Sequence, residues 1–325
     1  MKTNAIRMHA TGGPDVLHYE SVTVAAPGEG EVLLRHHAIG LNFADIYMRT
    51  GLYPPPSLPF IPGAEAAGEV LEVGAGVKGL AVGDRVAYGT GVGAYAQVRV
   101  AKAVNLVKLP KGISYETAAA MMLKGLTVHY LLRSTFRVKK GDVILLHAAA
   151  GGLGLILSQW AHALGATVIG TVSSPEKAKL ARKAGCKHVI DYTKDDFAAQ
   201  VKKITKGELC DVVYDGVGKT TFMGSLDCLK PLGTMVSFGN ASGPVEGVNL
   251  GILATKGSLY VTRPTLATYT RTAKEIQTRA KELFKMVLSG DVAIDIGARY
   301  PLAEAAAAQT ALAARKTTAA TILMP

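Results

Sequence analysis

The sequence predicts an α/β protein of two domains, one rich in β-strands and one built on a parallel sheet of six strands. The chain has 325 residues, 49% of them hydrophobic, which suffices for about two domains of ~150 residues each. Short apolar runs broken by Gly and Pro fill the chain from Met1 to about Leu123. Beyond them, strand-like and helix-like runs alternate, a pattern typical of a doubly wound parallel sheet.

The first region contains repeated turn signals between short apolar runs. Pro27-Gly28-Glu29-Gly30 precedes the run 31–35, and the run 82–86 encloses Gly83-Asp84. Such punctuation predicts strands joined by tight turns. An Ala- and Leu-rich helix is then expected from about Ser114, its N-cap, to Leu132, and it carries the chain into the second domain.

Six strands are predicted in the second region, with helices between them. One helix has Ser174 as N-cap, Pro175 at its first position and Gly185 just past its end. Another is expected to start at Thr193, with Asp196 three residues later. The predicted strands are Val143–His147, Thr167–Thr171, His188–Ile190, Asp211–Asp215, Thr234–Phe238 and Ser258–Thr262.

The C-terminal segment is expected to return to the first domain. After Pro264 come a helix over 272–288 stopped by Gly290, an Ala-rich helix over 302–314 and a final strand over 321–324. The predicted domains are therefore 1–124 together with 265–325, and 125–264.

Composition narrows the class of protein. No run approaches the ~20 apolar residues of a membrane span, and the first ten residues lack a signal peptide's apolar stretch, so we expect a cytoplasmic protein. The only cysteines, Cys186, Cys210 and Cys228, have no C-x-x-C spacing, which argues against structural zinc and disulfides. The net charge of +11 is compatible with anionic ligands, with nucleic acid, or with solubility alone.

The strongest local motif is a glycine loop between a strand and a helix. The run 143–147 leads into Ala148-Ala-Ala-Gly-Gly-Leu-Gly154, where Ala149, Gly151 and Gly154 take the positions of G-x-G-x-x-G. Any α/β protein can contain a Gly-rich turn, but the order strand, loop, helix favours a dinucleotide whose pyrophosphate lies at the helix N-terminus. The expected contacts are Ala150, Gly151, Gly152, Leu153 and Gly154.

The end of the next strand indicates which dinucleotide is bound. NAD-specific folds place Asp or Glu there to bind the ribose hydroxyls, whereas this chain has Thr171-Val-Ser-Ser174. Ser173, Ser174 and Lys177 offer hydroxyls and a cation to a 2′-phosphate, so NADPH is favoured over NADH. An ordinary exposed helix lysine is the alternative reading of Lys177.

Several segments together resemble the zinc-free quinone oxidoreductase (zeta-crystallin-like) branch of the medium-chain dehydrogenases/reductases, over essentially the whole chain. The resemblance implies a GroES-like catalytic domain built from both chain ends, a Rossmann domain between them, and NADPH in the cleft. The segments are Gly40–Tyr47, Gly51–Pro59, Pro62–Gly68, Gly83–Val86, Lys124–Thr127, His147–Gly152, Ser237–Asn240 and Val261–Pro264.

The resemblance also bears on metal binding. Zinc-dependent alcohol dehydrogenases of this superfamily carry a Cys where this chain has Asn42 and a His where it has Ala64. A catalytic zinc needs three protein ligands, and the remaining Glu65 cannot hold one alone. No metal site is expected.

Candidate site residues follow from the resemblance. Asn42, Asp45, Tyr47 and Tyr53 are expected at the catalytic cleft, with Tyr47 the best candidate for a substrate or proton contact, although both tyrosines are also compatible with simple packing. Phe238 as a core residue and Arg315 as a solvated helix end are likewise alternatives. The remaining implied cofactor contacts are Thr127, Tyr192, Phe238, Gly239, Asn240, Thr262 and Arg315.

The predicted activity is metal-independent hydride transfer from NADPH to a quinone or a similar conjugated carbonyl. A 2-enoyl or enone reductase is an alternative within the same chemistry. RNA binding or a structural, crystallin-like role is the alternative from another class. A homodimer is expected from the resemblance, through the sheet edge near Ser258–Thr262.

Overall fold

The computed structural model describes all 325 residues, Met1–Pro325, which form two compact units. The first unit comprises Met1–Leu126, Thr270–Leu288 and Ile294–Pro325, and the second comprises Thr127–Tyr269 with Ser289–Ala293. Helix α2 (Tyr115–Tyr130) carries the chain from one unit into the other. The short segment 289–293 groups with the second unit, although the sequence places it in the first domain. None of the helices is both long and apolar enough to span a bilayer.

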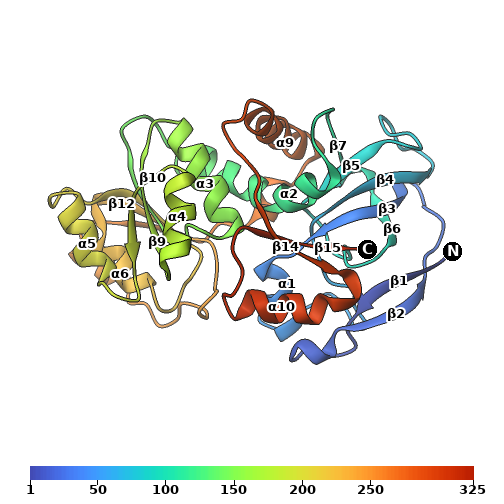
Figure 1. Cartoon of the computed structure of the whole chain (residues 1–325), viewed down its shortest axis with the longest axis horizontal. Helices are drawn as coiled ribbons and strands as arrows, with labels where there is room; N and C mark the ends of the chain where they lie inside the picture. Colours follow the sequence, from blue (N-terminus) through green and yellow to red (C-terminus); the bar gives the residue numbers. More distant parts are fainter. The chain divides into compact units, whose positions relative to one another are not determined.

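The first unit is built on a sheet of seven strands in the order β14-β15-β3-β4-β5-β7, with β6 beside β3 (Figure 1). Strand β15 pairs with β3 through Ile322 and Gly40, which confirms that the C-terminal strand returns to the first region. A separate hairpin is formed by β1 (Lys2–Arg7) and β2 (His18–Thr23). The sheet strands are β3 (Glu31–Gly40), β4 (Ala66–Val73), β5 (Arg85–Tyr88), β6 (Val98–Lys102), β7 (Val107–Lys108), β14 (Ile296–Pro301) and β15 (Ala320–Met324).

Four helices belong wholly or mostly to this unit. Ser114 caps α2 as predicted, since the Thr117 amide donates to its hydroxyl at 3.1 Å. The predicted helix over 302–314 begins as a 3-10 turn, Leu302–Glu304, and continues as α10. The other helices are α1 (Phe43–Thr50), α9 (Ala273–Leu288) and α10 (Ala305–Ala313), and further 3-10 turns lie at Pro14–Val16 and Ala103–Asn105.

The second unit is a fully parallel sheet of six strands in the order β10-β9-β8-β11-β12-β13. All six predicted strands are present, and the doubly wound fold class is confirmed. Strand order reverses beside β8, which marks the carboxyl ends of β8 and β11 as the place where such sheets bind ligands. The strands are β8 (Val143–Leu146), β9 (Thr167–Val172), β10 (Cys186–Asp191), β11 (Cys210–Asp215), β12 (Leu229–Ser237) and β13 (Tyr260–Thr262).

The helices of the second unit pack in two pairs, α3 with α4 and α5 with α6 (Figure 1). Because crossovers are right-handed and strand order reverses, the two pairs cover opposite faces of the sheet. Helix α2 ends in a π-helical turn, Leu131–Thr135. The helices are α3 (Gly152–Ala163), α4 (Pro175–Lys183), α5 (Phe197–Ile204), α6 (Phe222–Asp227), α7 (Gly251–Thr255) and α8 (Leu266–Tyr269).

Helix α4 begins as predicted and α5 does not. Ser174 caps α4 by accepting the Lys177 amide at 3.2 Å. Helix α5 starts at Phe197 with Asp196 as its N-cap, and the prediction of a start at Thr193 is wrong. The amide and hydroxyl of Thr193 instead donate to Asp191 Oδ1, at 3.1 and 2.7 Å, so this residue belongs to a turn.

Gly154 provides a test of how closely α3 packs on the glycine loop. A Cβ at Gly154 would lie 2.8 Å from Ala149 O and closer still to Ala148 O. We expect Gly154→Ala to lower the free energy of unfolding by about 1–3 kcal/mol, despite alanine's higher helix propensity, as measured by urea denaturation. Gly151→Ala is the matched control, because its nearest contact, Ala148 O at 3.3 Å, would be tight but without the severe overlap expected at Gly154. Equal stability of both variants would contradict this packing.

Candidate functional site

The glycine loop of the second unit joins β8 to α3. Ala148 has φ +54°, a left-handed conformation, and Gly151 is the N-cap of α3. The motif predicts the tight turn at Ala149, whereas the left-handed residue lies one position earlier. The first amides of a helix have no partner within it, so Gly152 and Leu153 offer N–H groups and a positive helix end to an anion.

The loop leaves room for a phosphate group. No atom of the chain comes nearer than 3.3 Å to a Cβ built on Gly151, so the protein's own packing does not require glycine there. A pyrophosphate close to the backbone would require it, and the loop therefore fits a dinucleotide. Gly170 in β9 is an unpredicted part of this geometry, since its Cβ would lie 2.7 Å from Ala149 Cβ. A glycine inside a strand run was the available signal.

The end of β9 carries a hydroxyl and a cation side by side. Lys177 Nζ donates to Ser173 Oγ at 3.3 Å, and both residues are half-buried. Ser174 uses its hydroxyl to cap α4, which leaves Ser173 and Lys177 as the predicted pair for a 2′-phosphate. Tyr192 lies beside them, because its amide donates to Val172 O at 3.1 Å, and its side chain is 39% exposed.

The ends of β11 and β12 approach each other closely. A Cβ on Gly239 would lie 2.8 Å from Gly216 Cα, and one on Gly216 would lie 3.0 Å from the Phe238 ring. The Phe238 amide also donates to Asp215 O at 2.8 Å. Phe238 is therefore a residue of the strand end that covers a glycine, rather than part of the interior of the sheet.

Asn240 follows directly and is held by an arginine. Its amide oxygen accepts from Arg263 Nη2 at 3.1 Å and its amide nitrogen donates to Gly239 O at 2.9 Å. Arg263 Nη1 also donates to Ser237 O at 2.9 Å. The structure thus brings Asn240 and Thr262, the last residue of β13, to one edge of the sheet. Arg263 was missed as a positioning residue, although it lies in a segment that carries the family resemblance.

Two predicted cofactor residues lie outside this group. Thr127 is buried on α2, at the start of the second unit. Arg315 is exposed, has φ +58° and follows α10 in the first unit. Their contacts with a cofactor stay predictions.

In the first unit, Asn42 and Glu65 belong to one buried polar cluster. Asn42 Nδ2 and Lys124 Nζ donate to the same oxygen, Glu65 Oε2, at 2.8 and 2.7 Å. The Leu123 amide donates to the other oxygen at 2.8 Å. The cluster thereby joins the start of α1, the segment before β4 and helix α2. Lys124 and the role of Glu65 were missed, because nothing in the sequence signals a pair 59 residues apart.

Asp45 extends this cluster. It is 1% exposed, and its Oδ2 accepts the Asn42 amide and the Tyr95 hydroxyl, both at 2.9 Å. Burial raises the pKa of Asp45 to about 7, against the lowering effect of the Asn42 amide, Tyr95 and Lys124. A carboxyl group so enclosed holds the first turn of α1 in place.

Tyr47 and Tyr53 form an aromatic pair on α1 and the loop after it. Their ring centroids lie 5.1 Å apart in an edge-to-face arrangement, and the Tyr53 amide donates to Tyr47 O at 2.9 Å. Phe43 also lies near Tyr47, with the two ring centroids 6.1 Å apart. This packing fixes both rings, and the predicted contact of Tyr47 with substrate stays a prediction.

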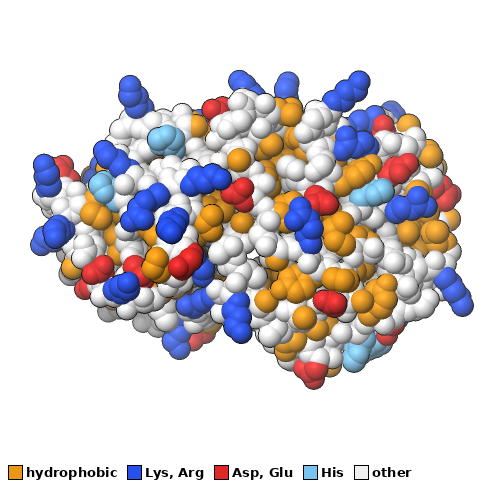
Figure 2. All heavy atoms as spheres, viewed as in Figure 1, with side chains coloured by type: hydrophobic (Ala, Val, Ile, Leu, Met, Phe, Trp, Pro, Cys, Tyr) orange, Lys and Arg blue, Asp and Glu red, His pale blue; other side chains and the backbone are white.

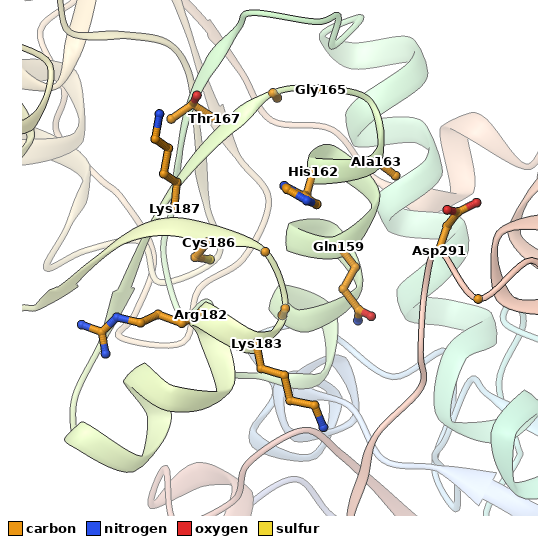
Figure 3. A pocket seen from close by; sticks show the side chains of 14 residues that line it. Gln159, His162, Ala163, Gly165, Thr167, Arg182, Lys183, Cys186, Lys187 and Asp291 are labelled. Atoms are coloured by element: carbon orange, nitrogen blue, oxygen red, sulfur yellow. The ribbon is translucent and has the colours of Figure 1, made fainter.

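A hollow of about 950 Å³ lies at the opposite end of the parallel sheet. It is formed where α3 and α4 end and where β9 and β10 begin, so it is distinct from the glycine loop (Figure 3). Arg182, Lys183 and Lys187 line it, but their side chains point in different directions. No cluster of three or more His, Cys, Asp or Glu side chains suitable for a metal ion is found in the structure.

The buried carboxyl group of Asp45 predicts a pH dependence of stability. Its pKa is about 7 in the folded chain against an ordinary 3.8, so the folded state binds the extra proton between these values. This contribution is complete below about pH 4 and is lost as the pH rises through 7. The free energy of unfolding should fall by roughly 1.4 kcal/mol per pH unit within that window. Urea denaturation of Asp45→Asn should show a smaller slope, whereas exposed Asp295→Asn should keep it; an unchanged slope in Asp45→Asn would rule this out.

Both units match known protein families. Residues 28–111 match the alcohol dehydrogenase GroES-like domain, and residues 152–286 match the zinc-binding dehydrogenase family. The chain is 57% identical to a quinone oxidoreductase of Pseudomonas aeruginosa, over 98% of this chain and 99% of that one. It is 46% identical to a 2-haloacrylate reductase of a Burkholderia species, over 98% of each.

A solved structure agrees with these relationships. The Escherichia coli quinone oxidoreductase complexed with NADPH is 50% identical and superposes with a TM-score of 0.97, over 99% of this chain and 100% of that one. The resemblance inferred from the motifs is thus confirmed. This chain belongs to the quinone oxidoreductase family, within the medium-chain dehydrogenase/reductase superfamily.

Proposed function

We propose that this protein reduces quinones by hydride transfer from NADPH. The observation that carries the choice of cofactor is the Ser173–Lys177 pair at the end of β9, where a carboxylate would repel a 2′-phosphate. The relatives named quinone oxidoreductases, at 50–57% identity, support the acceptor. One of them is complexed with NADPH.

The glycine loop and the strand ends divide the binding of NADPH between them. Gly151, Gly152 and Leu153 would hold the pyrophosphate, assisted by the helix N-terminus. Ser173 and Lys177 would bind the 2′-phosphate, and Ser174 would hold the first turn of α4 in place as its N-cap. The remaining proposed contacts follow the two ends of the cofactor: Tyr192 for the adenine, Ala150 and Gly154 for loop packing, Thr127, Phe238, Gly239, Asn240 and Thr262 for the nicotinamide half, and Arg315 for a phosphate.

Bound NADPH would supply the hydride, and the chain would supply position and polarity. A quinone oxygen gains negative charge as hydride arrives, and a hydrogen-bond donor stabilises that charge. Tyr47 and Tyr53 are the proposed donors. Asn42 and Asp45 would act through α1, which they hold at its N-terminus.

Reduction of an activated carbon–carbon double bond is the second candidate. The 46% identity to a 2-haloacrylate reductase favours it, since conjugated acceptors take hydride from the same cofactor. The alternative of nucleic-acid binding has weaker support. Figure 2 shows Lys and Arg side chains on the visible face separated by acidic and apolar ones, rather than gathered into one basic patch.

The test is NADPH oxidation by the purified full-length chain with 1,4-benzoquinone, an enone and 2-chloroacrylate as parallel acceptors. Quinone should give the highest kcat/KM. A preference for chloroacrylate or the enone would instead assign double-bond reduction. Tight NADPH binding without oxidation by any acceptor would contradict both activities and favour a binding or structural role.

Lys177→Ala tests the proposed cofactor preference. Loss of a charge-assisted contact should raise the KM for NADPH about tenfold or more and leave that for NADH nearly unchanged. Lys179→Ala is the matched control, because Lys179 is exposed on the same helix. Steady-state kinetics with both cofactors measures the effect, and equal changes for NADPH and NADH would refute a 2′-phosphate contact.

We further propose a homodimer that forms along β13. This strand is the open edge of the parallel sheet, and it exposes 62% of Tyr260 and 39% of Val261. Such an edge can pair with a second copy of itself. Sedimentation should show a dimer that Val261→Asp converts to monomer, whereas Val82→Asp, at an exposed site of the first unit, should not. A monomeric wild type would refute the proposal.

A further inference from the structure

A buried chain of polar side chains runs beneath the carboxyl edge of the parallel sheet. His147 lies between β8 and the glycine loop and is 3% exposed. Its Nδ1 is 3.0 Å from Thr171 Oγ1, and its Nε2 is 2.9 Å from Ser225 Oγ. Ser225 Oγ in turn donates to Asp215 Oδ2 at 3.3 Å. The chain therefore joins β9, β8, α6 and β11.

The partners of these groups give the hydrogen bonds a direction. Asp215 is fully buried, and its two oxygens accept from two backbone amides and from the hydroxyls of Thr221 and Ser225. Ser225 gives its single proton to Asp215 and so must accept one from His147 Nε2–H. Nδ1 is then free of a proton and accepts from Thr171. The imidazole is neutral in this arrangement, and burial lowers the pKa of His147 despite the opposing influence of Asp215.

Each end of this row of polar side chains fixes a different loop. At one end, Thr171 O accepts the Ala149 amide at 3.1 Å, which ties the glycine loop to the strand that leads to Ser173. At the other end, Asp215 Oδ1 accepts the amides of Val217 and Gly218 at 2.7 and 3.0 Å.

The second loop is linked onward to the end of β12. Gly216, which begins this loop, lies so close to Gly239 that there is no room for a Cβ on Gly239. The loop held by Asp215 therefore helps to set the position of Phe238 and Asn240. One end of the polar chain thus serves the proposed adenosine side of the cofactor site, and the other serves the nicotinamide side.

We infer that His147 is a positioning residue that supports both halves of the dinucleotide site, the adenosine half through Thr171 and the nicotinamide half through Ser225 and Asp215. The inference rests on the proposed function, because it assigns the two loops to the two ends of NADPH. His147 itself is only 3% exposed, so we assign it no direct contact with the cofactor.

Simple core packing is the competing explanation. The His147 ring lies edge-to-face on Phe197, with centroids 4.9 Å apart, and an aromatic ring of similar size would preserve that contact. His147→Phe therefore keeps the packing and removes both hydrogen bonds. His147→Gln keeps an amide donor that can reach Ser225 from the position of Nε2 and loses the acceptor for Thr171.

The experiment titrates the full-length chain and its variants with NADPH and with adenosine 2′,5′-bisphosphate, which carries only the adenosine end. His147→Phe should weaken both ligands, NADPH by about tenfold. Thr171→Val should also weaken both, whereas Ser225→Ala should weaken NADPH and leave the bisphosphate within about twofold. His147→Gln, which keeps only the bond to Ser225, should recover the part of the NADPH affinity that depends on Ser225 and leave the bisphosphate as weak as in Thr171→Val. Ser158→Ala is the control, a buried serine bonded to Cys186, and should leave both affinities unchanged.

Two outcomes would overturn the inference. One is a His147→Phe variant that is less stable yet binds both ligands as the wild type does, and the other is equal weakening of both ligands by Ser225→Ala. Thr171→Val and Ser225→Ala keep the test decisive if His147→Phe does not fold.

Hydrogen exchange separates this inference from the proposed function. If the wild type bound no NADPH, the proposed function would be wrong, and a role of His147 in cofactor binding would be excluded for the same reason. If wild type binds, the amides of Val217 and Gly218 should exchange faster in ligand-free Ser225→Ala than in wild type. Unchanged exchange there would overturn the proposed support of this loop through Ser225.

Discussion

Close contact between backbone segments at the carboxyl edge of the parallel sheet is the constraint on which the site depends. Helix α3 passes the glycine loop with no space for a side chain at Gly154, and Gly170 brings β9 against the same loop. Gly239 makes the corresponding approach to Gly216. These approaches fix the glycine loop against β9, which leads to Ser173, and the loop after β11 against the end of β12, which leads to Asn240, before any ligand binds. At Gly154 and Gly239 the neighbours are backbone atoms, so side-chain rearrangement cannot relieve a substitution there.

The two units stabilise their buried acids by different means, and each acid fixes the start of a functional segment. Glu65 is neutralised by Lys124 and bonded to Asn42, which makes its burial tolerable. Asp45 has no cation bonded to it and accepts only the Asn42 amide and the Tyr95 hydroxyl, and burial raises its pKa to about 7. Asp215 instead accepts two backbone amides as well as hydroxyl groups. Replacing any of these three acids would therefore remove a carboxyl group and also release the helix start or loop that it holds.

The local parts of this fold could be predicted from sequence, and the long-range parts could not. Six strands and the cap at Ser174 are visible because apolar runs and capping residues act within a few positions. Helix α5 starts later than predicted because Thr193 bonds Asp191 instead of capping the helix. The spacing of residues in the sequence does not decide between these two local partners. The Glu65–Lys124 pair and the Asp215 network join residues distant in sequence. The family resemblance predicted Asn42 and Asp45 as site residues. Only their contacts in the structure indicate that they hold the N-terminus of α1 in place.

The buried charges also bear on the choice between a quinone and an acrylate. A haloacrylate is an anion and needs a cation or several donors in its binding site, whereas a quinone is neutral and needs donors only for the charge that develops on its oxygens. Of the two cations buried on or near α1, Lys124 is paired with Glu65 at 2.7 Å, whereas Arg49 donates to the neutral Gly12 O at 3.1 Å and its Nε has no partner. Recruiting Lys124 to a substrate would leave Glu65 buried without a counter-charge, which typically costs about 3–5 kcal/mol. If the acceptor binds beside Tyr47 and Tyr53, as proposed, using Lys124 to bind an anionic acceptor would therefore cost more than binding a neutral one, which is a physical reason for preferring the quinone although the chain is also related to an acrylate reductase.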